Sequence, residues 1–320
     1  MRSQLNAAQS PAATLARVEN DLVRCTDAAE FPLSSMSRKI VDVLDRHSNC
    51  SRKGFALDVG TGSGVHAIIL NQMGYNCVLG VDSNSMAVSL ALRRAIRLGL
   101  SAAPISRGRI AGESVNWGNA KIWFCASPLQ ELNKFLSRSA DLIIFNPPSF
   151  FSKSSIDDSS TVSTGVYSGR IEDALNVEGS LLYQLFDSVV LPLLAIGGEL
   201  ICSWPGLERR SVEIDPKPDR AGIPVHPASL LAHWFGLKVT ADHEDPADFY
   251  KYTASISDYG LGGAFWLNFR QAIDTRCYSS FLSLDDSRRE LDAEFRFGVL
   301  HLTRTGIRSF TTNPVGESDE

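Results

Sequence analysis

The sequence predicts an α/β fold, in which a mostly parallel sheet of seven strands carries helices on both faces and follows an N-terminal helical cap. From residue 55 onward, short apolar runs alternate with amphipathic stretches that stop at glycines. This alternation is typical of parallel strands joined by crossover helices. With 320 residues, of which 44% are hydrophobic, the chain can bury the large core that such a sheet needs.

The first 50 residues have a different pattern from the rest of the chain. Apolar residues recur there at three- and four-residue spacing, and "FPLSS" interrupts them once, which predicts two helices. We assign residues 1–50 to an N-terminal helical cap or lid and residues 51–320 to the main domain. The main domain is expected to contain an insertion at about residues 244–294.

The main domain alternates strands and helices in chain order. The expected strands cover residues 55–60, 77–82, 121–127, 141–146, 199–204, 237–242 and 295–304. The expected helices between them cover residues 63–74, 85–99, 129–138 and 179–198, the last ending at a glycine pair. The Ser/Thr-rich stretch 151–178 and the aromatic-rich insertion fall outside this alternation. Long segments in such places are usually functional.

The composition argues against several classes of protein. The 31 basic and 36 acidic residues leave a net charge of −5, so nucleic acid is an unlikely partner, and Arg93, Arg94 and Arg97 are interpreted as a solvated helix face. No apolar run is long enough for a membrane span, and no secretory signal is visible. The six cysteines lack C-x-x-C spacing, so we expect no metal site and a cytoplasmic location.

A glycine-rich loop, "LDVGTGSG", follows the first strand of the main domain and opens a helix. Gly60, Gly62 and Gly64 permit a tight turn and close approach of a ligand, and the helix offers free N–H groups. Their spacing differs from the dinucleotide fingerprint. Asp58 would repel a pyrophosphate but attract an ammonium group. The loop therefore favours a cofactor that carries an amino acid over NAD.

An acidic residue ends the second strand of the main domain, in "GVDSNS". Asp82 is expected beside the glycine loop, where a carboxylate can accept hydrogen bonds from both hydroxyls of a ribose. Alternatively, Asp82 or Ser83 caps the helix that follows. The two roles are compatible.

The fourth strand ends in "LIIFNPPSF", in which two prolines stop the apolar run. The amide oxygen of Asn146 and the carbonyl of Pro147 can both accept hydrogen bonds from a substrate –NH₂. They would aim its lone pair and stabilise positive charge that develops on the nitrogen. The alternative is a rigid turn with no chemical role.

Together, "ALDVGTGSGVHAIIL…VLGVDSNSMAVSLALRRAIRLGL" and the Asn-Pro-Pro motif resemble class I S-adenosylmethionine (SAM)-dependent methyltransferases over about residues 54–205. The chain is similar to the branch that methylates amino groups, which includes the release-factor glutamine methyltransferases and the adenine and guanine rRNA enzymes. "GSLLYQLFDSVVLPLLAIGGELICSWPG" also resembles the glutamine enzymes. The resemblance implies a Rossmann-like class I methyltransferase sheet with SAM as its cofactor.

The resemblance also implies roles for individual residues. Asp58 and the glycine loop would hold the methionine part of SAM, and Asp82 would hold the ribose with Ser83 beside it. Ser127 stands where the family often has an acid that contacts the adenine amino group. A serine accepts this hydrogen bond more weakly than a carboxylate. Asn146 and Pro147 would orient the acceptor nitrogen beside the cofactor.

Ser149 departs from the family pattern, because the amino-methylating enzymes usually place there an aromatic ring that stacks on a planar substrate. Aromatic residues follow instead at Phe150 and Phe151, so either the loop is shifted or no planar group is stacked. The second case makes SAM a candidate substrate, as in the similar azetidine-2-carboxylate synthases. There the α-amine attacks the γ-carbon and expels methylthioadenosine. Tyr183 could supply an aromatic face near the sulfonium, with core packing as the alternative.

The sequence therefore predicts a SAM-dependent N-methyltransferase-type enzyme whose acceptor is a small molecule or a protein amide. Cyclisation of SAM to azetidine-2-carboxylate is the enzymatic alternative. A non-catalytic SAM-binding scaffold is the minor alternative, and the intact glycine loop and Asn-Pro-Pro motif argue against it.

Overall fold

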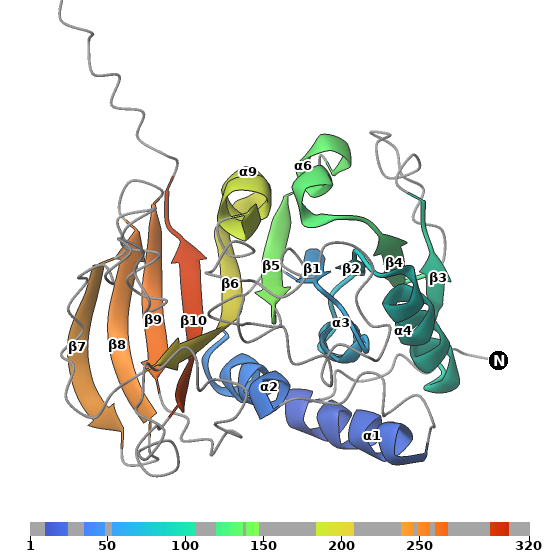
Figure 1. The fold of residues 1–320 in the computed structure, drawn as a ribbon, viewed down its shortest axis with the longest axis horizontal. Coiled ribbons are helices and arrows are strands. Elements are labelled where there is room, and N and C mark those ends of the chain that lie inside the picture. The colour runs from blue at the N-terminus through green and yellow to red at the C-terminus, as the bar shows by residue number, and fades with distance from the viewer. Residues whose placement is uncertain are drawn as a thin grey trace, which may run out of the picture.

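The computed structural model describes residues 10–24, 35–48, 53–106, 120–136, 139–146, 184–207, 238–245, 249–256, 260–267 and 295–306. These residues form one mixed sheet of ten strands in the order β3-β4-β2-β1-β5-β6-β10-β9-β8-β7 (Figure 1). The strands are β1 (Phe55–Val59), β2 (Cys77–Asp82), β3 (Ala102–Pro104), β4 (Ile122–Ala126), β5 (Ala140–Phe145), β6 (Leu194–Leu207), β7 (Lys238–Asp245), β8 (Phe249–Ile256), β9 (Leu261–Leu267) and β10 (Phe295–Arg304).

The sheet has a parallel half and an antiparallel half. Strands β3, β4, β2, β1, β5 and β6 pair in parallel, whereas β10 runs antiparallel between β6 and β9, and the β7–β8–β9 pairings are antiparallel. All five residues of β1 are buried, as expected for a strand in a parallel sheet covered on both faces. Parallel pairing also brings the carboxyl ends of β1, β2, β4 and β5 to one edge of the sheet.

The predicted count of seven strands is wrong, because the described residues form ten. Each of the seven expected ranges contains a strand, and β3, β8 and β9 are additional. Strands β8 and β9 come from the segment expected to lie outside the alternation. The sequence sets this segment apart as an aromatic-rich insertion, but its glycines permit close strand packing. A Cβ at Gly263 would collide with the carbonyl of His301 on β10.

The expected helix over residues 179–198 ends earlier than predicted. A π-helical turn, η5 (Phe186–Val190), continues into α9 (Leu191–Leu193), and β6 begins at Leu194. The glycine pair that looked like a helix stop lies inside β6, where the pairing with β5 shifts register. Gly197 has φ of 77°, and a Cβ at Gly198 would approach the Ala140 carbonyl to 2.9 Å. The glycines therefore permit an irregular strand start.

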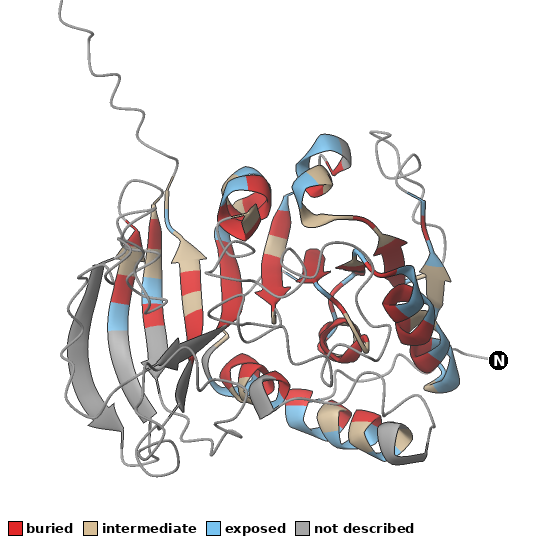
Figure 2. Cartoon of the chain, viewed as in Figure 1, coloured by how far each residue is buried: buried red, intermediate tan, exposed pale blue. Residues whose placement is uncertain are grey.

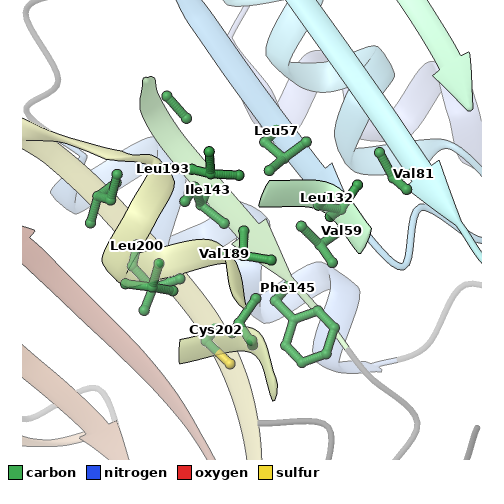
Figure 3. Close-up of a cluster of buried hydrophobic side chains, with 14 of the residues drawn as sticks. Leu57, Val59, Val81, Leu132, Ile143, Phe145, Val189, Leu193, Leu200 and Cys202 are labelled. Carbon is green, nitrogen blue, oxygen red and sulfur yellow. The ribbon is translucent and has the colours of Figure 1, made fainter. Parts of the chain in front are cut away.

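Helices cover both faces of the parallel half of the sheet (Figure 1). The helices are α1 (Pro11–Arg24), α2 (Ser35–His47), α3 (Val65–Gln72), α4 (Ser85–Arg97), η2 (Leu129–Glu131), α6 (Leu132–Phe135), η5 and α9. Buried residues of α1 to α4 form one apolar cluster with one face of the sheet. Residues of α6, η5 and α9 pack on the opposite face (Figure 3). No helix among the described residues is long and apolar enough to cross a membrane.

The two N-terminal helices share a core with the sheet. Buried residues recur along one side of α1 and α2 (Figure 2). Val18 of α1 and Ile40 and Leu44 of α2 are almost fully buried in the cluster that includes α3 and the strands. Their apolar spacing, which predicted the two helices, is the spacing of this buried face. The division into residues 1–50 and 51–320 stays a prediction.

Candidate functional site

The glycine loop joins β1 to α3 at the carboxyl edge of the sheet. Gly60, Gly62 and Gly64 have φ values of 66°, 48° and 79°, in the left-handed region that favours glycine. A Cβ at Gly64 would lie 2.8 Å from the Cβ of Ala91 on α4, so the helices pack too closely there for a side chain. The loop therefore needs glycine for its backbone conformation and, at Gly64, for space.

The buried side chain of Asp58 anchors this loop through hydrogen bonds. Its side chain is fully buried, and its Oδ2 accepts hydrogen bonds from the Thr61 hydroxyl at 2.6 Å and the Ala67 N–H at 3.0 Å. Its Oδ1 lies 3.7 Å from Nδ1 of the buried His66. The carboxylate thus ties the loop to the first turn of α3. Its predicted attraction for a ligand ammonium stays a prediction.

Asp82 closes the other side of the loop. Its Oδ2 accepts a hydrogen bond from the Gly62 N–H and its Oδ1 accepts one from the Asn84 N–H, both at 2.9 Å. Burial raises the pKa of Asp82 above its ordinary value, and the negative charge of Asp58 adds to the rise, while the two N–H donors partly offset it. The carboxylate therefore sits at the tip of β2, directly against the loop, as predicted for a ribose ligand.

The helix cap after β2 differs from the expectation. Asn84 is the N-cap of α4, because its Oδ1 accepts a hydrogen bond from the Met86 N–H at 2.9 Å. The alternative that Asp82 or Ser83 caps this helix is therefore wrong. Ser83 is exposed at the edge of the site. Because Asn84 caps α4, the Asp82 carboxylate is not needed as a helix cap. It contacts the glycine loop instead.

Ser127 lies beside Asp82 at the end of β4. It is almost fully buried, its N–H donates to the Asp82 carbonyl at 2.9 Å, and its hydroxyl donates to the Pro128 carbonyl at 3.2 Å. The strand pairing of β2 with β4 places it there. The structure thus brings Ser127 to the same edge as the loop and Asp82, while its predicted contact with an adenine stays a prediction.

Asn146 follows β5, whose last residue, Phe145, lies across from Val59 of β1. Its amide is held from both ends. The Ser203 hydroxyl donates to Oδ1 at 2.5 Å, and Nδ2 donates to the Ser37 hydroxyl at 3.0 Å. The ring of Phe145 comes within 3.8 Å of a Cβ position at Gly60, so the asparagine follows a residue that touches the loop. Pro147, Tyr183, Ser149, Phe150 and Phe151 lie outside the described residues.

Sequence reasoning missed a buried arginine behind the loop. Arg94 on α4 is 1% exposed, its Nη1 donates to the Ser63 carbonyl, and its Nε lies 3.4 Å from Oδ2 of Asp21 on α1. The interpretation of Arg94 as part of a solvated helix face is therefore wrong. Its helical phase with the buried Ala87 and Ala91 was the available signal.

Ser37 and Ser203 were also missed. Each is a serine that forms part of no recognisable motif. Its role becomes visible only when its distant partner, Asn146, is known. Ser203 shares the phase of Ile201 on β6 and so faces the helices, as Asn146 shares the phase of Ile144 on β5. Alternation along the two strands was the signal that could have paired them.

The loop, Asp82 and Ser127 fit a SAM-type cofactor. Gly60 and Gly62 have no side chains, and α3 begins with its N-terminus at this edge, which suits an anionic group. The half-buried carboxylate of Asp82 suits a pair of hydroxyls. Among the described residues, no group of three or more His, Cys, Asp or Glu is placed to hold a metal ion.

These features define an α/β protein in which the glycine loop, Asp82 and Ser127 lie together at the carboxyl edge of a parallel sheet. The family model of ribosomal protein L11 methyltransferase (PrmA) matches residues 36–102, which span α2 to α4 and include the glycine loop and Asp82. This match supports the predicted class, a SAM-dependent methyltransferase, with S-adenosylmethionine as its cofactor. The match covers a minor part of the chain.

Solved structures give distant likenesses. A Thermoplasma acidophilum protein is 12% identical, with 93% of this chain and 100% of that chain covered at a TM-score of 0.42. The N-methyltransferase NodS of Bradyrhizobium japonicum, solved with S-adenosyl-L-homocysteine, is 11% identical (92% and 99%, TM-score 0.39). A SAM-dependent methyltransferase of Clostridium acetobutylicum is 14% identical (92% and 99%, TM-score 0.32). TM-scores below 0.5 carry no functional weight. A search of curated proteins found no match.

Proposed function

We propose that this protein is a SAM-dependent N-methyltransferase in which Asn146 orients an amine or amide nitrogen of a small molecule or a protein toward the methyl group. The observation that carries the proposal is the position of the Asn146 amide. It stands at the end of β5, next to the strand that leads into the glycine loop, and hydrogen bonds hold both of its polar atoms.

The residues at this edge would bind the cofactor and position the acceptor nitrogen. The glycine loop and Asp82 would bind SAM, which supplies an electrophilic methyl group on a sulfonium. The Asn146 oxygen would accept a hydrogen bond from the acceptor nitrogen and stabilise the positive charge that grows on it. The nitrogen lone pair forms the new C–N bond as the S–C bond breaks. The bonding electrons leave with S-adenosylhomocysteine, and the nitrogen then loses a proton.

Two observations bear on the class of the acceptor. The PrmA family acts on a ribosomal protein by its name, which favours a nitrogen of a protein as the acceptor. The chain carries a net charge of −5, which disfavours nucleic acid. A small-molecule amine stays within the proposal.

The test compares wild-type protein with Asn146→Ala, using Asn133→Ala on the exposed surface of α6 as a matched control. Each protein is incubated with SAM and ribosomal-protein or small-amine acceptors, and products are separated by mass spectrometry. We expect S-adenosylhomocysteine to form only with an acceptor. Asn146→Ala should lower kcat about 100-fold, as removal of one stabilising group in a transition state does, with SAM affinity largely kept. Asn133→Ala should behave as wild type.

Other products would contradict the proposal in different ways. Methylthioadenosine formed from SAM alone, faster than the spontaneous background, would identify the cyclisation alternative. SAM binding without either product would identify a scaffold. Full activity of Asn146→Ala would remove the amide from the mechanism.

A further inference from the structure

We infer that Ser37 and Ser203 are positioning residues for Asn146, and that helix α2 thereby forms part of the catalytic edge. The inference rests on the proposed function, because it concerns how the same amide is aimed. Its basis is a continuous pair of hydrogen bonds that runs from Ser203 on β6 through Asn146 to Ser37 on α2.

The two hydrogen bonds hold the amide at both of its ends. The Ser203 hydroxyl donates to Oδ1, and the Ser37 hydroxyl accepts from Nδ2. The terminal torsion of an asparagine is soft, so an amide without such partners turns over readily. A turned amide would point N–H groups at the N–H groups of an acceptor, which repel. The serines therefore hold the amide at both ends and restrict its rotation, so that its position beside the acceptor nitrogen is fixed.

The strand register explains why Ser203 meets Asn146. Strands β5 and β6 run in parallel with Phe145 across from Cys202, so the next residue on each strand meets its counterpart. Ser203 is 2% exposed and Ser37 is 8% exposed. Buried hydroxyls are expensive unless they have hydrogen-bond partners, and both hydroxyls meet this need at Asn146.

A second set of contacts fixes α2 at the opposite edge of the sheet. The Ser48 hydroxyl donates to Oε2 of the buried Glu199 at 2.8 Å, and Nε2 of His301 lies 3.3 Å from the same oxygen. The eleven residues from Ser37 to Ser48 span about 16 Å as a helix. The four from Glu199 to Ser203 span about 13 Å as a strand. The helix thus lies along β6, so Ser37 and Ser48 lie at opposite edges of the sheet.

The test uses full-length Ser37→Ala and Ser203→Ala, with Ser48→Ala as a matched control that removes a hydrogen bond of α2 at the far edge. Two readouts are made. The first is the NMR signals of the Asn146 side-chain amide, assigned by their loss in Asn146→Asp. The second is turnover of SAM with an acceptor. We expect Ser37→Ala and Ser203→Ala to shift the amide signals and speed their hydrogen exchange. We expect kcat to fall about tenfold with SAM affinity unchanged.

Ser48→Ala should change neither readout, and Ser203→Thr, which keeps the hydroxyl, should retain most of the turnover. An unchanged amide signal in Ser37→Ala, or an equal loss of turnover in Ser48→Ala, would overturn the inference. Shifted signals with full turnover would overturn the positioning role and leave the N-methyltransferase proposal standing. Wild-type protein that binds SAM but releases no product would refute the proposed function and, with it, the positioning role.

Discussion

At the scale of single residues, the two aspartates of the site occupy different environments. Asp58 is fully buried, and its Oδ2 accepts hydrogen bonds from the Thr61 hydroxyl and the Ala67 N–H. Asp82 lies at the strand tip and accepts two backbone N–H groups. Asp58 therefore shapes the loop, while Asp82 combines a structural contact with access to a ligand. The pKa of Asp82 is raised because burial makes its charged form less favourable.

This raised pKa predicts a pH dependence of stability. In the unfolded chain Asp82 titrates near its ordinary value of 3.8, and in the folded protein it titrates at a higher pH. The folded state thus holds the proton more tightly, so the contribution of Asp82 to the free energy of unfolding falls as pH rises from 3.8 through the raised pKa. Urea unfolding of wild type and Asp82→Asn across this range should show wild type losing stability relative to the variant. A difference that stays constant with pH would contradict the expectation.

At the scale of elements, the contact between α3 and α4 depends on one missing side chain. Gly64 precedes α3, and the Cβ of Ala91 on α4 would lie 2.8 Å from a Cβ placed there. This approach seats α3 with its N-terminus at the carboxyl edge. Arg94, one helical turn after Ala91, then reaches the Ser63 carbonyl from the same face of α4. The glycine loop is therefore held by α4 as well as by the strands.

Two glycines allow this packing to be measured apart from backbone strain. Gly64 and Gly99 have nearly equal φ values of 79° and 77°, but a Cβ at Gly99 meets nothing within 4 Å. Gly99→Ala should lower the free energy of unfolding by about 1–2 kcal/mol through the left-handed conformation alone. Gly64→Ala should cost about 1–3 kcal/mol more, because the added methyl group overpacks the helix contact. Chemical denaturation of both variants measures the difference, and equal losses would show that α3 can move away from α4 freely.

At the scale of the whole molecule, ion pairs join α1 to α4 and to α2, in addition to the apolar core that the helices share with the sheet. Asp21 of α1 reaches both Arg94, at 3.4 Å, and Arg97, at 2.9 Å, on α4. On the outer surface, Glu19 of α1 pairs with Arg38 of α2 at 2.7 Å. The first pair includes a buried arginine, whereas both side chains of the second are exposed.

These two ion pairs should differ in their effect on stability. Asp21→Asn removes the negative charge beside the buried Arg94 guanidinium and should lower the free energy of unfolding by about 3 kcal/mol. Glu19→Gln, the matched surface change, should lower it by less than about 1 kcal/mol, because solvent screens an exposed pair. Thermal and urea unfolding of the two variants give the comparison. Similar small losses in both would mean that α1 contributes little to the position of α4.

The sequence predicted the site residues at the strand ends, but not the serines that hydrogen-bond to Asn146. Asp58, Asp82 and Asn146 each end or nearly end a buried strand, and parallel pairing brings such ends to one edge. Ser37, however, lies 109 residues from Asn146 along the chain, and Ser203 lies 57 residues from it. No local pattern encodes contacts of that separation. Strand β9 escaped detection for a related reason, since its Gly263 packs against His301 on the distant strand β10.

The position of β10 has a consequence for folding. It pairs with β6 on one side and β9 on the other, so among the described strands it makes the hydrogen-bonded link between the parallel half and the β7–β8–β9 half (Figure 1). Until residues 295–304 leave the ribosome, β6 and β9 both present open edges that can pair with other chains. The sheet therefore becomes continuous only when β10, the last of the described strands in sequence, inserts between β6 and β9.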